Sequence, residues 1–128
     1  MTNEMFKKEA FKKSVKDNVK FLYRKTIEEA TQEQIFQAVS YSVKDVIIDN
    51  WLATQKAYDE QDPKIVYYMS MEFLMGRSLK TTLYNLELAD DVRAILQDYH
   101  INLDNIFECE PDAGPVSYTH LTLPTIRL

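Results

Sequence analysis

Cysteine, histidine and glycine are all scarce in this chain of 128 residues. Cys109 is the only cysteine, so no disulfide can form within the chain, which suits a reducing compartment. The two histidines, His100 and His120, have no cysteine or carboxylate at ligand spacing, and no metal site is predicted. The two glycines, Gly76 and Gly114, are few enough to favour long helices over left-handed turns.

Long apolar runs are also absent, so we expect no membrane span. The N-terminus is charged throughout and lacks the apolar centre of a secretory signal, and we expect a cytoplasmic protein. The net charge of −5 argues against non-specific binding of nucleic acid by the whole chain. The first 25 residues carry a net positive charge instead, because they contain eight Lys and Arg residues but only three acidic ones.

Apolar residues at helical spacing predict four or five helices. Val15, Val19, Leu22 and Tyr23 form one stripe on a helix whose outer face is basic. Thr31 lies three residues before Gln34, which is a capping-box pattern. A long helix is therefore expected to start there and to end near residue 58. Its apolar stripe comprises Ile35, Val39, Val43, Val46, Ile47 and Trp51.

Three shorter helices and one strand follow in this reading. The stretch IVYYMSM at residues 65–71 is typical of a short buried strand. A helix is expected to start near Gly76 or Ser78, another is capped at Asp90, and a last one covers residues 102–111. One strand cannot form a sheet alone, because its backbone groups need a neighbour. The strand therefore indicates a missing part of the fold, or else it is a loop.

Residues 51–88, WLATQKAYDEQDPKIVYYMSMEFLMGRSLKTTLYNLEL, carry a more specific signal. They resemble the N-terminal region of the α-glucan phosphorylases, the glycogen, starch and maltodextrin enzymes. The resemblance extends over roughly residues 5–114. The residues that fill the family motif are Tyr67, Tyr68, Ser70, Glu72, Phe73, Gly76, Arg77 and Leu79.

The resemblance implies an enzyme, a glycosyltransferase of carbohydrate metabolism. Such enzymes bind pyridoxal phosphate and cleave terminal α-1,4-linked glucose from a glucan with inorganic phosphate, giving α-glucose 1-phosphate. The family has an α/β fold of two Rossmann-like domains (GT-B type), of which this mostly α-helical chain with one short strand would be the N-terminal part. The cofactor's lysine and the second domain are not in the chain, so the 128 residues alone are expected to be inactive. The choice between glycogen, starch and maltodextrin stays open.

The resemblance places some of these residues near the cleft. Glu72 matches a glutamate at the end of the first strand, where open α/β sheets bind ligands. A role near the phosphates and a local role in bonding free N–H groups are equally good readings of it. Leu74 holds a position that faces the cofactor, where it would only pack. We expect Arg77 to form a buried ion pair rather than to contact the substrate. Tyr67 and Tyr68 are expected in the core.

Regulation and assembly are also implied by the resemblance. Gln34 and Asp59 stand where the animal enzymes bind a nucleotide activator, and a carboxylate at residue 59 would repel a nucleotide phosphate. We therefore predict no activation by AMP. Residues 28–39 match the family's subunit-contact cap, so a homodimer is expected at full length. Ser14 lies within the first predicted helix and is expected to be an exposed helical serine.

The last sixteen positions hold no acidic residue, although 20 precede them. Residues Glu110 to Gly114 match the phosphorylase sequence just before its glycine-rich phosphate loop, and Gly114 would start that loop. Instead, PVSYTHLTLPTIRL follows, which resembles translated sequencing adapter. We therefore expect residues 1–114 to be the phosphorylase portion and residues 115–128 to be a non-native tail.

Two other functions remain open. The chain would act as a short helical protein that binds a phosphorylase partner and disrupts its dimers, if the tail is encoded in the genome. Alternatively, the basic first helix would bind an anionic membrane or nucleic acid. The acidic remainder of the chain argues against the second, and lysines on a solvated helix face are the more ordinary interpretation.

Overall fold

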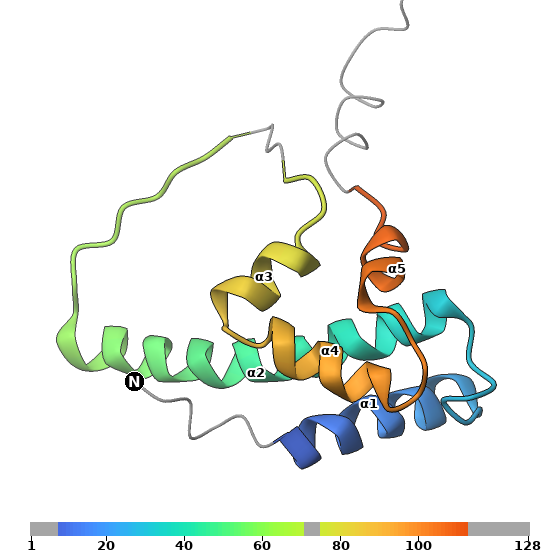
Figure 1. Ribbon diagram of the computed structural model, residues 1–128. Helices are drawn as coiled ribbons and strands as arrows, with labels where there is room; N and C mark the ends of the chain where they lie inside the picture. Colours follow the sequence, from blue (N-terminus) through green and yellow to red (C-terminus); the bar gives the residue numbers. More distant parts are fainter. Residues whose placement is uncertain (1–7, 71–74, 113–128) are drawn as a thin grey trace, which may run out of the picture.

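The computed structural model describes residues 8–70 and 75–112. Five helices lie within these residues: α1 (Lys8–Tyr23), α2 (Gln32–Gln61), α3 (Leu79–Asn85), α4 (Ala89–Gln97) and α5 (Leu103–Glu108). α2 is the longest of them, and α1 and α5 both pack against it (Figure 1). α4 packs against α1, α3 and α5. The expected number of helices is confirmed, and the described chain is mostly helical.

The core forms where one face of α1 meets the first half of α2. Phe11, Val15 and Val19 recur every four residues on α1 and are buried. Leu22 belongs to the apolar stripe predicted for this helix, but it lies near the end of α1 and is exposed. The apolar residues that the other helices bury in the same cluster are Ile35, Phe36, Ala38, Val39, Val43, Leu79, Leu83, Ala89, Val92, Ile95, Leu96, Leu103, Ile106 and Phe107.

The start of α2 has the capping box that the sequence predicts. The Gln34 N–H donates to Thr31 Oγ1 at 3.3 Å, and the Thr31 N–H donates to Gln34 Oε1 at 3.1 Å. Two backbone donors that the helix leaves unpaired are thereby satisfied. α2 then runs to Gln61, a few residues past the expected end near Tyr58.

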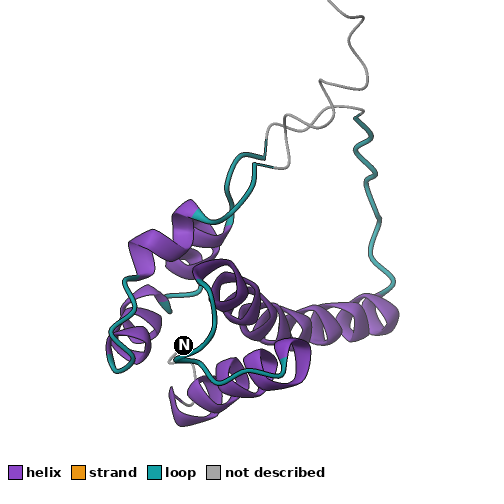
Figure 2. Cartoon of the chain, turned by 90° about the vertical axis from the view of Figure 1, so that its right-hand side faces the viewer, coloured by secondary structure: helices purple, strands orange, loops and turns teal. Residues whose placement is uncertain are grey.

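Only the first half of α2 belongs to the core. Val43 is buried, but Ile47 is 36 % exposed and Trp51 is 61 % exposed. The apolar stripe of the sequence continues, yet none of the other described helices covers it (Figure 2). The predicted apolar stripe therefore lies in the core only as far as Val46.

The predicted strand at residues 65–71 is absent from the described residues of that stretch. Residues 65–70 are extended, but they form no strand with other described residues and run clear of the helices (Figures 1 and 2). Tyr67 is 80 % exposed and Tyr68 is 83 % exposed, so their expected place in the core is wrong as well. No strand forms here because extended backbone becomes a strand only when its N–H and C=O groups pair with another strand.

Left-handed backbone occurs at more positions than the low glycine content predicts. Arg24, Asp62, Glu87 and His100 all have φ between 43° and 58°. Each follows closely on the end of a helix, where a left-handed residue lets the chain turn away and pairs the last carbonyls. This conformation is unfavourable for residues with a Cβ atom, so tertiary packing has overridden the local preference at four helix ends.

The shorter helices begin largely as expected. α3 starts at Leu79, directly after Ser78, and Asn102 caps α5 by accepting the Asp104 N–H at 2.9 Å. The cap expected at Asp90 is wrong, because α4 begins at Ala89 and Asp90 lies in its first turn. An acidic side chain there still favours the helix through its dipole.

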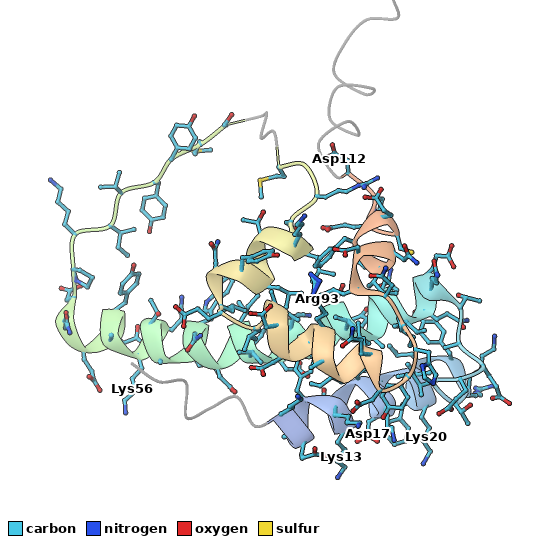
Figure 3. All side chains as sticks on the ribbon, in the orientation of Figure 1. Lys13, Asp17, Lys20, Lys56, Arg93 and Asp112 are labelled. Carbon is cyan, nitrogen blue, oxygen red and sulfur yellow. The ribbon has the colours of Figure 1, made fainter. Side chains whose placement is uncertain are left out.

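Polar contacts join α1 to its neighbours. Ser14 is half-buried rather than exposed, and its Oγ lies 3.0 Å from Oγ of the buried Ser42 on α2. Lys12 Nζ donates to Asp98 Oδ2 at 2.6 Å, which raises the pKa of Lys12 and lowers that of Asp98. Figure 3 shows Lys13 and Lys20 pointing away from the other helices, as expected for a basic outer face.

Replacing Thr31 with alanine should lower the free energy of unfolding by about 1 kcal/mol, because the Gln34 N–H loses its acceptor. Urea unfolding followed by circular dichroism measures this. Thr54→Ala is the matched control, since Thr54 Oγ1 donates to Asn50 O at 3.0 Å on the exposed part of the same helix and caps nothing. It should change stability by less than about 0.5 kcal/mol. Equal losses in both variants would contradict the role of the cap.

Candidate functional site

The family motif is only partly covered by the described residues. The motif residues that can be placed are Tyr67, Tyr68, Ser70, Gly76, Arg77 and Leu79. Glu72 and Phe73 of the motif lie outside the described residues, as do the candidate site residues Leu74 and Gly114. The site that can be built from contacts is therefore the one that flanks them, at the start of α3 and the end of α5.

Glu110 binds the start of α3 with both carboxylate oxygens. Its Oε1 accepts the Ser78 N–H at 2.9 Å and lies 3.1 Å from the Ser78 hydroxyl, and its Oε2 accepts the Leu79 N–H at 2.9 Å. The first N–H groups of a helix have no partner within it, and a carboxylate there also meets the favourable end of the helix dipole. Ser78 makes no side-chain cap of its own, so Glu110 serves as the cap of α3 from 32 residues away.

Arg77 forms a second link between the same two segments. Its Nη1 donates to Glu108 Oε2 at 2.7 Å. This hydrogen bond, together with the charge of Glu108, raises the pKa of Arg77 above its ordinary value. The ion pair expected for Arg77 is confirmed, but the expectation that it is buried is wrong, since both side chains are exposed. An exposed pair contributes little to stability because water screens it.

The two links bring together parts of the chain that are far apart in sequence. The turn before α3 and the end of α5 lie on the same side of the molecule (Figures 1 and 2). Asp112, the last described residue, lies just beyond α5 on that side (Figure 3). Gly76 has φ of +60°, and it supplies a left-handed step directly before Arg77 without strain.

The two activator positions are at opposite ends of α2. Gln34 lies in its first turn, and its Oε1 is engaged by the Thr31 N–H and by Lys25 Nζ at 3.4 Å. Asp59 is exposed near the end of the helix. At 1.5 Å of rise per residue, the 25 residues between them span about 37 Å. One copy of the chain does not bring them together.

Cavities in the described chain lie mostly away from the motif. One of about 740 Å³ is at the end of α1, and the basic residues among its lining are Lys16, Lys20, Arg24 and Lys25. A smaller cavity of about 300 Å³ lies between α2 and α3, where Ser78, Leu79 and Glu110 reach it. Ser40, whose buried Oγ has no hydrogen-bond partner, also lines this second cavity.

Neither a metal centre nor a reactive thiol emerges from the part of the chain that is described. No group of three His, Cys, Asp or Glu residues within residues 8–70 and 75–112 is arranged to hold a metal ion. Cys109 is half-buried, and its burial raises the pKa of its thiol. In the same ranges, no helix is both long and apolar enough to cross a membrane.

Comparison with known proteins gives one consistent result. The chain is 40 % identical over 106 residues to glycogen phosphorylase of Chlamydia pneumoniae and 42 % identical over 106 residues to that of Chlamydia trachomatis. It is 36 % identical over 103 residues to the brain form of human glycogen phosphorylase. The chain is homologous to the glycogen phosphorylases. No protein-family model matches the sequence.

These alignments cover 80–83 % of this chain but only 12–13 % of each phosphorylase. The chain thus spans about one-eighth of the length of its relatives, consistent with a portion of a phosphorylase. A match of this extent favours the phosphorylase reading over an unrelated helical binding protein. The resemblance expected from the motif is confirmed.

The roles of Glu108 and Glu110 were not predicted from the sequence. Glu110 matches the phosphorylase pattern as a residue, but nothing near it in sequence points to a helix start at residue 79. A capping box is recognisable because its two members are three residues apart. The pairs here are separated by 31 or 32 residues, and the only local sign is that Ser78 precedes α3 without capping it.

Glu110→Ala should speed hydrogen exchange at the Ser78 and Leu79 amides about fivefold, which corresponds to the loss of about 1 kcal/mol per hydrogen bond. NMR exchange rates of the folded chain measure this residue by residue. Glu87→Ala is the control, because Glu87 is an exposed acid on the loop that follows α3. Unchanged rates in the Glu110 variant would mean that the carboxylate does not hold the start of α3 in solution.

Proposed function

We propose that this chain is part of an α-glucan phosphorylase. The full-length enzyme transfers the terminal α-1,4-linked glucose of a glucan to inorganic phosphate and releases α-glucose 1-phosphate. The observation that carries the proposal is the identity of 40–42 % over 106 residues to two bacterial glycogen phosphorylases. The intact motif around Arg77 supports it, because that stretch contains the residues by which the resemblance is recognised.

The described chain would supply scaffold rather than catalysis. Its exposed apolar side chains are consistent with a place inside a larger protein, because soluble proteins rarely leave such patches uncovered. Val66 to Met69 in the extended stretch are the most exposed of them, and Trp51 and Leu52 on α2 are exposed as well. We propose that the rest of the enzyme covers these surfaces, and that the extended stretch joins the sheet of a GT-B fold there.

The proposed cofactor of the full-length enzyme is pyridoxal phosphate, whose phosphate group would assist proton transfer to the attacking phosphate. Leu74, the residue proposed to pack near it, lies outside the described residues, as does Glu72, proposed to act near the phosphates. Arg77 forms an exposed ion pair with Glu108 at 2.7 Å in this structure, and we propose that its role is structural. Arg77 instead helps to hold the chain beside the motif.

We further propose that the full-length enzyme is a homodimer in which residues 28–39 contact the partner subunit. This segment offers a polar surface, since Glu28, Glu29, Gln32 and Glu33 are all exposed around the start of α2. Sedimentation of the full-length enzyme should give the mass of two chains. Glu28→Arg should shift it towards one chain, while Glu87→Arg, on the loop after α3, should not. A monomeric wild type would exclude the proposal.

Residues 1–114 are proposed as the phosphorylase portion and residues 115–128 as a tail of non-native origin. The sequence of the source DNA across the codons for Asp112 to Pro115 tests this directly. We expect the genomic reading frame to leave the present sequence there and enter a glycine-rich stretch that begins with Gly114. A genome that encodes PVSYTHLTLPTIRL followed by a stop would refute the tail and favour a short regulatory protein.

The enzyme expressed from the full-length gene should release glucose 1-phosphate from glycogen, starch or maltodextrin only when inorganic phosphate is present. The 128-residue chain alone should release none, because it spans about one-eighth of its relatives. A coupled assay for glucose 1-phosphate measures both. Glucose release that is independent of phosphate would identify a hydrolase and overturn the proposal.

AMP should not activate this enzyme. The carboxylate of Asp59 is exposed on α2 and would repel a nucleotide phosphate, and the Gln34 amide is engaged in the capping box. Initial rates at limiting phosphate should agree within about twofold with and without saturating AMP, which is smaller than the typical allosteric factor of about 5 or more. A larger AMP-dependent rise would show that other residues form an activator site.

A further inference from the structure

Four basic side chains line the cavity of about 740 Å³ at the end of α1: Lys16, Lys20, Arg24 and Lys25. Lys16, Lys20 and Arg24 are spaced four residues apart, so they follow one side of α1 and its end. Like charges at this spacing repel one another and make a helix less stable. The helix dipole favours cations only within the last turn, so it does not account for Lys16.

The positive charge at this cavity is not neutralised by nearby carboxylates. Among the described residues, no carboxylate forms a salt bridge with any of the four cations. Lys12, one turn earlier on α1, differs because its Nζ pairs with Asp98 Oδ2 at 2.6 Å. Glu28 and Glu29 also line the cavity, but Glu29 Oε2 accepts the Thr26 N–H at 3.2 Å. Four cations thus outnumber two carboxylates there, and the cavity is net positive.

Aromatic rings orient two of these cations without neutralising them. Lys16 Nζ lies 5.2 Å from the centre of the Tyr99 ring, and Lys20 Nζ lies 5.3 Å from the centre of the Phe21 ring. The face of a ring attracts an ammonium group but does not cancel its charge. Each ammonium group therefore keeps its charge and its N–H donors for an acceptor in the cavity.

We propose that this cavity binds a small compound that carries two or more phosphate charges. The planar guanidinium of Arg24 suits two oxygens of one phosphate group, and the ammonium groups of Lys16, Lys20 and Lys25 suit the remaining charge. A hollow lined by cations concentrates anions more strongly than a flat surface does, which favours a soluble phosphate compound over a membrane. None of the lining residues belongs to the family motif, and the inference does not rest on the proposed function.

Titration of the 128-residue chain with inorganic pyrophosphate in a calorimeter tests the proposal. We expect one saturable site, and Lys20→Gln and Arg24→Gln should each raise Kd about tenfold, because each removes a charge-assisted hydrogen bond. Lys13→Gln is the matched control, since Lys13 is on the same helix but does not line the cavity (Figure 3). It removes the same charge and should change Kd by less than about twofold, because water and salt screen an exposed charge. Circular dichroism checks that each variant is folded.

Two results of this titration would overturn the proposal. One is a wild-type chain that shows no saturable binding of pyrophosphate. The other is an equal rise in Kd for Lys13→Gln and Lys20→Gln, because general positive charge would then explain the binding. Vesicles that contain an anionic lipid form the second arm of the experiment. Binding to these vesicles without binding of pyrophosphate would show that the basic side chains face a membrane, and would overturn the proposal as well.

Discussion

Burial of the apolar face on the first half of α2 is the interaction on which the rest of the described structure depends. Val39 and Val43 on this face are buried, and α1 and α5 pack against α2. α4 in turn packs against α1 and α5. Removing this much apolar surface from water is the dominant favourable term in folding. The polar contacts then fix details: the Ser14–Ser42 pair sets how α1 lies on α2, and Lys12–Asp98 ties α1 to the end of α4.

Features that depend on neighbours in sequence were predictable, and features that depend on distant residues were not. The capping box of α2 and the buried faces of α1 and α4 follow from spacings of three or four residues. The cap of α3 does not, because Glu110 reaches it from the segment that follows α5. The left-handed residues at four helix ends are a related case. Local preference favours glycine there, but the packing of the helices decides where the chain must turn, and Glu87 or His100 then adopts the conformation despite its Cβ atom.

The apolar residues that the structure leaves exposed on α2 and in the extended stretch share one cause. Trp51, Tyr67 and Tyr68 are of residue types that are often buried, but a side chain is buried only if another element covers it. The extended stretch is in the same situation for its backbone, since it has no strand beside it among the described residues. Composition therefore indicated correctly which surfaces are apolar. Only the lone predicted strand at residues 65–71 raised the question of whether the covering element lies within these 128 residues.

The start of α3 shows how one side chain can hold a helix end that lies far from it in sequence. Bonds to the backbone fix a segment better than an ion pair between exposed, flexible side chains. Glu110 bonds two consecutive backbone N–H groups there, whereas Arg77 and Glu108 join the same segments only through one exposed pair. A motif read from sequence marks Arg77 first, because its charge and its fixed spacing are conspicuous. The contacts assign the stronger hold to the carboxylate, whose partners are unremarkable backbone atoms 31 and 32 residues away.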